Sequence, residues 1–311
     1  MCIHQYRLFI DMKLNLKTLA LLLTVIILSN SAYNTKVAKE LVYMSAIAGE
    51  SVKAIDEWSC SYCKKYNLIN VKAQNAQGQD LQWFSGYSKS LEGIIISFRG
   101  SSNIPNWISN LSFKQVAYPR CSGCKVHDGF FSAWNLAKPI VLKRIQELRS
   151  LHRDAPIYVT GHSLGGALAS LCASELHAVY GALHGVMTFG EPRVGNSQYS
   201  EYYHSVHMIF RVVHYADIVP HLPAKIQGFV HEGEEVWYNP AMSSYKICAW
   251  GETDECSNSL KTAYNTGDHS IDIYVKLPES FFERASLYFE EKADLFKQKM
   301  LSFKQEKELS I

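Results

Sequence analysis

Short apolar runs alternate with amphipathic stretches along the middle of the chain. Four mostly apolar runs of four to six residues are typical of strands buried on both faces of a sheet; they are Gly93–Phe98, Ile157–Thr160, Val186–Phe189 and Ile209–Val213. Residues 37–57, 140–151 and 164–176 instead have the composition and spacing of helices. Strands that alternate with helices predict an α/β fold class with a mainly parallel central sheet and right-handed crossovers.

The pattern changes beyond Pro278. Apolar residues recur three and four positions apart from Phe282 to Phe303, with Lys and Glu between them, which is typical of one amphipathic helix. We expect residues 279–311 to form an extra C-terminal amphipathic helical tail that packs on the main domain. A role at a membrane surface or in self-association is the alternative.

The amino terminus has the pattern of a sorting signal. A short basic region, Met12–Lys17, precedes an apolar run, Leu19–Leu28, and small residues follow. A membrane-spanning helix needs about 20 apolar residues, and this run has half that length, so a cleaved signal peptide is favoured over an anchoring helix. We therefore expect residues 1–31 to be a signal peptide, residues 32–278 to be the functional domain, and the protein to be secreted, to an extracellular or digestive compartment, without a stable membrane span.

Composition and charge restrict the possible partners. The chain of 311 residues is 47% hydrophobic and 12% aromatic, which excludes a disordered protein. Its 31 basic and 29 acidic residues give a net charge of +2, and removing residues 1–31 (three basic, one acidic) leaves 28 of each. A neutral body has no electrostatic means of holding a polyanion. We expect no nucleic-acid partner, and a monomer.

The cysteines fall into groups. Of the eight, Cys2 lies in the leader, and Cys172, in an Ala- and Leu-rich helical stretch, is expected to be a buried thiol. The other six form three close pairs: Cys60/Cys63, Cys121/Cys124 and Cys248/Cys256. A four-thiolate zinc site usually separates its two C-x-x-C pairs by roughly 15–20 residues, far less than the separation here. In a secreted chain the pairs predict three disulfides, with zinc binding or redox chemistry as alternatives.

One pentapeptide has the pattern of a catalytic nucleophile. Gly161-His-Ser163-Leu-Gly165 fits G-x-S-x-G and lies between a predicted strand and a predicted helix, as a nucleophile elbow requires. The glycines permit the sharp turn, and the free N–H groups at the start of the helix stabilise negative charge. We therefore interpret Ser163 as the nucleophile rather than as a structural turn serine.

A serine nucleophile needs a base and an acid that orients it, and in this fold the chain order is serine, acid, histidine. Asp217 is the first acid at the end of an apolar strand after the serine. His221 is too close to Asp217 in the chain to reach both partners, and His231 reads as a surface group beside an acidic loop. His269, in a turn before residues 271–275, is the predicted base.

The remaining groups near the serine have predicted roles as well. The oxyanion hole requires two N–H donors, expected from Leu164 and from the loop Gly100-Ser101 after the strand 93–98. His162 is expected to hydrogen-bond the elbow, and His127 reads as a structural histidine. Serine acyl transfer needs no metal or organic cofactor, so none is expected.

Several motifs together resemble one family, the secreted filamentous-fungal triacylglycerol lipases of class 3. The resemblance covers roughly residues 38–276, and its motifs are Phe98-Arg-Gly-Ser-Ser102, Asn106-Trp-Ile108, Lys125-Val-His-Asp-Gly-Phe130, Thr160-Gly-His-Ser-Leu-Gly-Gly166, Gly190-Glu-Pro-Arg-Val-Gly195, Asp217-Ile-Val-Pro-His-Leu-Pro223, Cys256-Ser-Asn-Ser259 and Asp268-His269. It implies an α/β-hydrolase fold, a triad of Ser163, Asp217 and His269, oxyanion donors at Ser101 and Leu164, and a helical lid just after Ser101.

The chain departs from the resemblance in some places. The fungal enzymes join their termini by a disulfide, but the mature chain has no cysteine before Cys60 or after Cys256. Cys121/Cys124 and the tail are additional. Pro105 and Asn110 replace charged residues that are common in fungal lids.

The segment after Ser101 has the pattern of a lid. Ile104, Trp107, Ile108 and Leu111 are spaced to form one face of a short helix, opposite a polar face. We expect residues 102–113 to cover the site in water and to open at a lipid–water interface. A fixed surface helix beside an open site is the alternative.

These features predict a secreted serine lipase, a carboxylic ester hydrolase that cleaves acylglycerols through an acyl-enzyme. Because the same triad serves related esters, a phospholipase A1 and a feruloyl or short-chain esterase are the nearest rivals. A catalytically inactive hydrolase-like binding protein is a more distant one.

Overall fold

The computed structural model describes residues 33–76, 81–181, 183–204, 209–261 and 264–278. The described residues from Thr35 onward belong to one compact unit. The predicted signal peptide, residues 1–31, and the predicted helical tail, residues 279–311, lie outside the described residues.

An eight-stranded sheet forms the centre of the described chain, in the order β1-β2-β3-β6-β7-β8-β9-β10. Its strands are β1 Leu68–Ala76, β2 Leu81–Ser88, β3 Gly93–Phe98, β6 Ile157–His162, β7 Gly185–Phe189, β8 Ile209–His214, β9 Glu234–Tyr238 and β10 Tyr245–Cys248. Parallel pairs join β3, β6, β7, β8 and β9, and antiparallel strands flank them on both sides. The prediction of a mainly parallel central sheet is confirmed.

The strands β1, β2, β9 and β10 were not predicted. Most positions of β1 are half-buried or exposed, and β10 is mostly not buried, so neither contains the continuous apolar run that marks the central strands. A small separate sheet pairs β4 Gln115–Ala117 with β5 Lys125–His127.

The helices in the described residues differ in part from the prediction. They are α2 Thr35–Ile47, α3 Val52–Asp56, α4 Ile104–Ser109, α5 Asp128–Leu151, α6 Leu164–Tyr180, α7 Ser197–Tyr203 and α8 Ile271–Tyr274. Short 3₁₀ turns are η1 Cys63–Lys65, η2 Val219–His221, η3 Lys225–Gln227, η4 Ser257–Leu260 and η5 Gly267–His269.

The single helical stretch predicted over residues 37–57 is wrong, because the chain forms two helices there. The Ser51 side chain accepts a hydrogen bond from Ala54 N, 3.2 Å away, and so starts α3 as its N-cap. The amphipathic stretch 140–151 is the second half of the longer α5, which contains Pro139.

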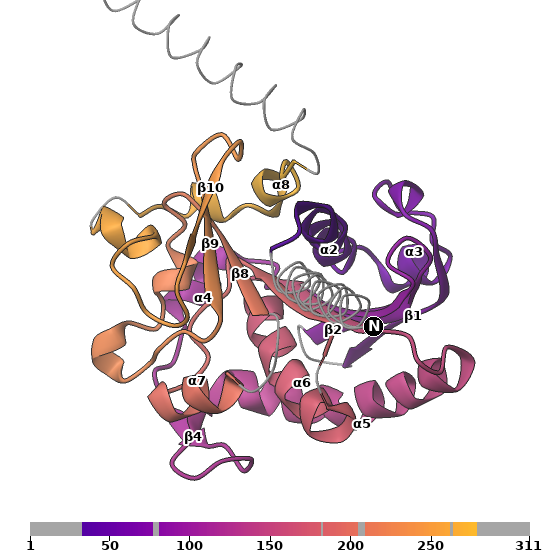
Figure 1. Ribbon diagram of the computed structural model, residues 1–311, viewed down its shortest axis with the longest axis horizontal. Helices are drawn as coiled ribbons and strands as arrows, with labels where there is room; N and C mark the ends of the chain where they lie inside the picture. Colours follow the sequence, from indigo (N-terminus) through magenta and orange to yellow (C-terminus); the bar gives the residue numbers. More distant parts are fainter. Residues whose placement is uncertain (1–32, 77–80, 182, 205–208, 262–263, 279–311) are drawn as a thin grey trace, which may run out of the picture. The chain divides into compact units, whose positions relative to one another are not determined.

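Helices cover both faces of the sheet, with α2 on one side and α5 and α6 on the other (Figure 1). Alternate residues of a strand point to opposite faces. Accordingly, Ile96 and Phe98 of β3 belong to the core shared with α5 and α6, whereas Ser97 Oγ donates to the Met44 carbonyl of α2 at 2.9 Å. Because β3, β6, β7 and β8 pair in parallel, their carboxyl ends lie at one edge of the sheet, where the predicted site residues follow the strands.

Three disulfides join Cys60 to Cys63, Cys121 to Cys124 and Cys248 to Cys256, as predicted. Cys172 is a free, buried thiol in α6, also as predicted. No helix among the described residues is long and apolar enough to cross a membrane.

Alkylation of the purified protein should distinguish the six disulfide-bonded cysteines from the free Cys172. Without reductant, the six paired cysteines should resist iodoacetamide, and Cys172 should react only after unfolding, because alkylation requires an accessible thiolate. Intact-mass measurement before and after reduction counts the modified residues. Rapid labelling of any paired cysteine in the native, unreduced protein would contradict the pairing.

Candidate active site

Ser163 lies on the tight turn between β6 and α6. Its φ of 58° and ψ of −130° are strained for a residue with a side chain. The two flanking glycines are required by close approach: a Cβ on Gly161 would lie 2.1 Å from the Gly165 carbonyl oxygen, and one on Gly165 would lie 2.2 Å from that of Phe98. Ser163 N donates to the Phe189 carbonyl at 2.9 Å, which fixes the turn against the end of β7.

The predicted acid and base are in direct contact. His269 Nδ1 lies 2.8 Å from Asp217 Oδ2, although 52 residues separate them in the chain. The remaining bonds to this carboxylate come from Tyr274, whose hydroxyl donates to Oδ2 at 2.6 Å, and from Val219 N, which donates to Oδ1 at 2.8 Å. The contact of Tyr274 was not predicted, since no motif around this residue signals a contact with Asp217.

The carboxylate of Asp217 is buried and ionised. Burial alone would raise its pKa, but His269 and the hydrogen bonds from His269, Tyr274 and Val219 outweigh burial and lower the pKa. An ionised acceptor on Nδ1 leaves Nε2 of a neutral His269 free to take a proton. Ser163 Oγ and His269 Nε2 are both buried, and neither has a hydrogen-bond partner among the described residues.

Gly190, at the end of β7, makes room for this pair. Its φ is +57°, which favours glycine. A Cβ there would lie 2.7 Å from Asp217 Oδ2 and 2.9 Å from His269 Cε1 and Nδ1. The absence of a side chain at Gly190 therefore lets the acid and the base approach the backbone that also holds Ser163.

Two other histidines near the elbow serve structural roles. His162 was expected to hydrogen-bond the elbow, but its Nε2 instead donates to the His269 carbonyl at 2.8 Å. Burial, reinforced by the nearby His269, lowers the pKa of His162 to about 3, so its ring is neutral. His127 accepts from Phe130 N and contacts the Ser112 carbonyl, as a structural histidine should.

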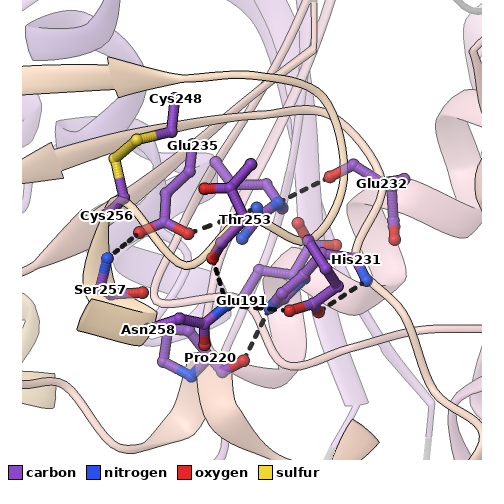
Figure 2. Close-up of polar contacts among 12 residues, drawn as sticks. Glu191, Pro220, His231, Glu232, Glu235, Cys248, Thr253, Cys256, Ser257 and Asn258 are labelled. Atoms are coloured by element: carbon purple, nitrogen blue, oxygen red, sulfur yellow. Dashed lines mark hydrogen bonds and ion pairs between the residues drawn. A yellow bond between two sulfur atoms is a disulfide. The ribbon is translucent and has the colours of Figure 1, made fainter. Parts of the chain in front are cut away.

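The interpretation of His231 as a surface group is wrong. The side chain is buried, and Nε2 lies 2.7 Å from the Pro220 carbonyl oxygen. His231 belongs to a buried polar network with Glu191, Glu232 and Glu235, close to the Cys248–Cys256 disulfide (Figure 2). Arg211 compensates part of the acidic sequence that follows His231, because it pairs with Glu235 at 3.5 Å. Glu252, which accepts from His231 N at 3.1 Å, pairs with Arg193 at 2.5 Å.

A cavity of about 470 Å³ lies beside the elbow. Its lining includes Ser101 and Leu164, the two predicted oxyanion donors, together with Trp107 and Leu111 of the lid segment. The loop that carries Ser101 passes close over the elbow, since a Cβ on Gly100 would lie 2.8 Å from the His162 carbonyl oxygen. The cavity thus reaches Leu164, the residue after Ser163, while Ser163 itself is fully buried.

The lid segment contains one short helix, α4. Asn103 caps it by accepting from Asn106 N at 3.0 Å. The four residues of the apolar stripe are half-buried, and the polar residues of the opposite face are exposed. Trp107 stacks nearly parallel on Phe130, with ring centroids 6.2 Å apart.

No group of three or more His, Cys, Asp or Glu side chains in the described part of the chain is arranged to hold a metal ion. The elbow instead has a buried serine, near a histidine that contacts an ionised acid, beside a partly apolar cavity.

Comparison with known proteins places this geometry in a family. The family model Lipase (class 3) matches residues 95–227. A lipase of Rhizomucor miehei is 34% identical over 242 residues, which cover 74% of this chain and 67% of that protein. The chain belongs to the class 3 lipases. The predicted α/β-hydrolase fold is confirmed, and so is the predicted activity class, a lipase acting as a carboxylic ester hydrolase.

Two further relatives of this lipase carry informative names. A solved triacylglycerol lipase whose catalytic centre is described as a serine protease triad matches with a TM-score of 0.66 and 33% identity, covering 74% of this chain and 91% of the other. A protein named secreted mono- and diacylglycerol lipase A, from Penicillium cyclopium, is 33% identical over 184 residues, 56% of this chain and 60% of that protein.

Proposed function

We propose that this class 3 lipase hydrolyses the carboxylic ester bonds of acylglycerols through an acyl-enzyme formed on Ser163. The observation that carries the proposal is the buried contact of 2.8 Å between His269 and Asp217, beside a serine in strained elbow geometry. The relatives that act on triacylglycerols, or on mono- and diacylglycerols, support this substrate class.

In the proposed mechanism, His269 Nε2 removes the proton from Ser163 Oγ as Oγ attacks the ester carbonyl. The N–H groups of Ser101 and Leu164 stabilise the negative oxygen of the tetrahedral intermediate. The protonated histidine then gives its proton to the departing alcohol, and water attacks the acyl-enzyme by the same route in reverse. Asp217 remains ionised throughout and stabilises the protonated His269.

A substrate panel tests the proposed class against its rivals. The purified enzyme should hydrolyse tributyrin and a long-chain triglyceride faster than phosphatidylcholine or ethyl ferulate, because the half-buried lid stripe and the neutral charge favour neutral lipid. Faster hydrolysis of phosphatidylcholine would favour a phospholipase A1. Hydrolysis of ethyl ferulate alone would favour a feruloyl esterase, and no hydrolysis of any ester would favour a binding protein.

We propose secretion on the basis of the amino-terminal sequence and of relatives named as secreted lipases. The three disulfides support the proposal, because disulfides persist in oxidising compartments. The partners proposed for the secreted monomer are a lipid–water interface and its acylglycerol substrate.

We propose that residues 102–113 act as a lid. Ser163 is fully buried here, so a substrate reaches it only after something moves, and α4 is the amphipathic element beside the cavity. In water the apolar face of α4 is best buried. At a lipid surface the same face can rest on lipid, which removes the advantage of the closed state and shifts the population.

The rate of tributyrin hydrolysis, measured through the solubility limit of tributyrin, tests the lid. We expect a sharp rise above the limit, lost when Trp107 and Ile108 are both replaced by serine, because these residues supply the apolar face. Asn106→Ser, on the polar face, is the matched control and should keep the rise. A smooth saturation curve for the unmodified enzyme would show that nothing opens.

A further inference from the structure

The lid carries a feature that ester hydrolysis does not use. Asn110-Leu111-Ser112 is an N-x-S sequence, the acceptor pattern for N-linked glycosylation, and it is the only N-x-S or N-x-T in the 311 residues. Asn110 is the C-cap of α4, and its side chain is exposed. We propose that Asn110 carries an N-linked glycan. This proposal rests on the proposed secretion, because glycosylation occurs on the secretory route.

The surroundings of Asn110 can accept a sugar. Its Nδ2 donates to Asn106 Oδ1 at 3.0 Å, and because an amide has two hydrogens, one remains for this bond after the other is replaced. The next residues have no regular structure, and Ser112 and Phe113 are exposed. No packed side chain has to move.

The position also suits a lid that contacts lipid. The side chain of Asn110 is exposed at the rim of the cavity, whereas the stripe that includes Trp107 and Ile108 is half-buried. A hydrophilic glycan on the stripe would separate it from lipid, whereas a glycan on Asn110 stays in water while the stripe rests on the lipid surface. Glycosylation here is therefore compatible with binding to an interface.

The test is to express the full chain with its own leader in a eukaryotic secretory host and to compare intact masses before and after peptide N-glycosidase treatment. We expect one glycan on the secreted protein, absent from Asn110→Gln and from Ser112→Ala, and retained by the neighbouring control Asn106→Gln. Asn110→Gln and Ser112→Ala each remove the acceptor pattern. If one of these variants does not fold, the other still tests the proposal.

A reporter variant separates the possible failures. Ile69→Thr completes an acceptor pattern at Asn67, which is exposed and lies outside the lid segment. A glycan on the reporter but not on the unmodified chain would overturn the proposal for Asn110 alone. No glycan on either would overturn it as well, and would also contradict the proposed secretion.

A different observation concerns Glu191, which is labelled in Figure 2. Its side chain is 1% exposed. Its Oε1 accepts from Ser170 Oγ of α6 at 2.5 Å, and its Oε2 accepts from Thr188 Oγ1 of β7 at 2.6 Å. The geometry points to Glu191 as a positioning residue, which ties the helix that begins at Ser163 to the end of β7. This inference rests on the proposed role of Ser163.

The residues next to Glu191 contact both the Asp217–His269 pair and Ser163. Gly190, the preceding residue, lies against Asp217 and His269, and the Phe189 carbonyl before it accepts from Ser163 N. The first turn of α6 packs on Glu191 directly, since a Cβ on Gly166 would lie 3.0 Å from Glu191 Cβ. A shift of this carboxylate therefore changes the position of Ser163 relative to His269.

The rate at which an organophosphate inactivates the enzyme tests this role, because it reports nucleophile geometry. We expect Glu191→Ala to lower kcat and the inactivation rate by about 10- to 100-fold, since small misplacements of reacting groups have effects of this size. KM should change little. Glu191→Gln should recover most of the loss, because an amide can exchange hydrogen bonds with both hydroxyl groups.

Controls separate positioning from stability. Glu235→Gln alters another buried carboxylate of the same network and should leave the inactivation rate per folded molecule unchanged. If Glu191→Ala does not fold, Ser170→Ala and Thr188→Val each remove one partner and should each lower the rate. An unchanged rate per folded molecule would overturn the positioning role. Labelling of the unmodified enzyme at a residue other than Ser163 would instead overturn the proposed nucleophile.

Discussion

Replacing Ser163 with alanine is expected to lower ester hydrolysis by about 10⁴- to 10⁶-fold, the range found when the nucleophile of a serine hydrolase is removed. The reason is chemical rather than structural: without Oγ no acyl-enzyme forms, and His269 has no proton to remove. Alanine fits the same strained turn, because the close approaches there involve Gly161 and Gly165. The rate on a soluble short-chain ester is the measurement.

The control for this variant is its fold. Its circular dichroism spectrum and melting temperature should match those of the unmodified enzyme, because Ser163 Oγ makes no hydrogen bond within the described residues. A well-folded Ser163→Ala that retained a tenth of the activity would contradict the assignment.

Asp217→Asn is expected to lower the same rate by about 10⁴-fold, with the fold retained. Asp217 accepts the bond from His269 Nδ1, which leaves Nε2 without a proton and able to act as the base. An asparagine amide can donate to Nδ1 instead, and the ring then carries its proton on Nε2, where it can no longer accept one from Ser163. The measurement is again kcat/KM on a soluble ester.

Asp268→Asn is the matched control for this variant. Asp268 is the acid next to His269 in the chain, but it accepts from Ala216 N and Asn265 Nδ2 rather than from the ring. Its replacement should have a much smaller effect on kcat/KM. Equal losses in the two variants would show that Asp217 has no special role.

Much of the fold could be predicted, because buried parallel strands leave a continuous apolar pattern. The strands β3, β6, β7 and β8 are such runs, and all of their positions are buried or nearly so. The flanking strands could not be predicted in this way. Strand β1 has one solvated face, and β2 is buried although Gln82, Ser85 and Ser88 interrupt its apolar residues.

The sequence predicts the candidate site only through the nucleophile motif and the order in which serine, acid and histidine follow along the chain. The elbow has a local pattern, and the required order then selects Asp217 and His269. The contacts of Tyr274 and Gly190 with this pair depend on segments brought together by the fold, so no local pattern announces them. His231 was misinterpreted for the same reason, because its acceptor on Pro220, and Arg211, which pairs with Glu235, come from other segments of the chain.

Covalent labelling tests the central claim, that Ser163 is the acylated nucleophile, most directly. The enzyme is treated with one equivalent of diethyl p-nitrophenyl phosphate, and its activity and peptide masses are measured on the same sample. We expect activity to be lost in proportion to the label, and the diethyl phosphoryl group to be found on the peptide containing Ser163. Complete loss of activity with the label on another residue, or full labelling of Ser163 with activity unchanged, would contradict it.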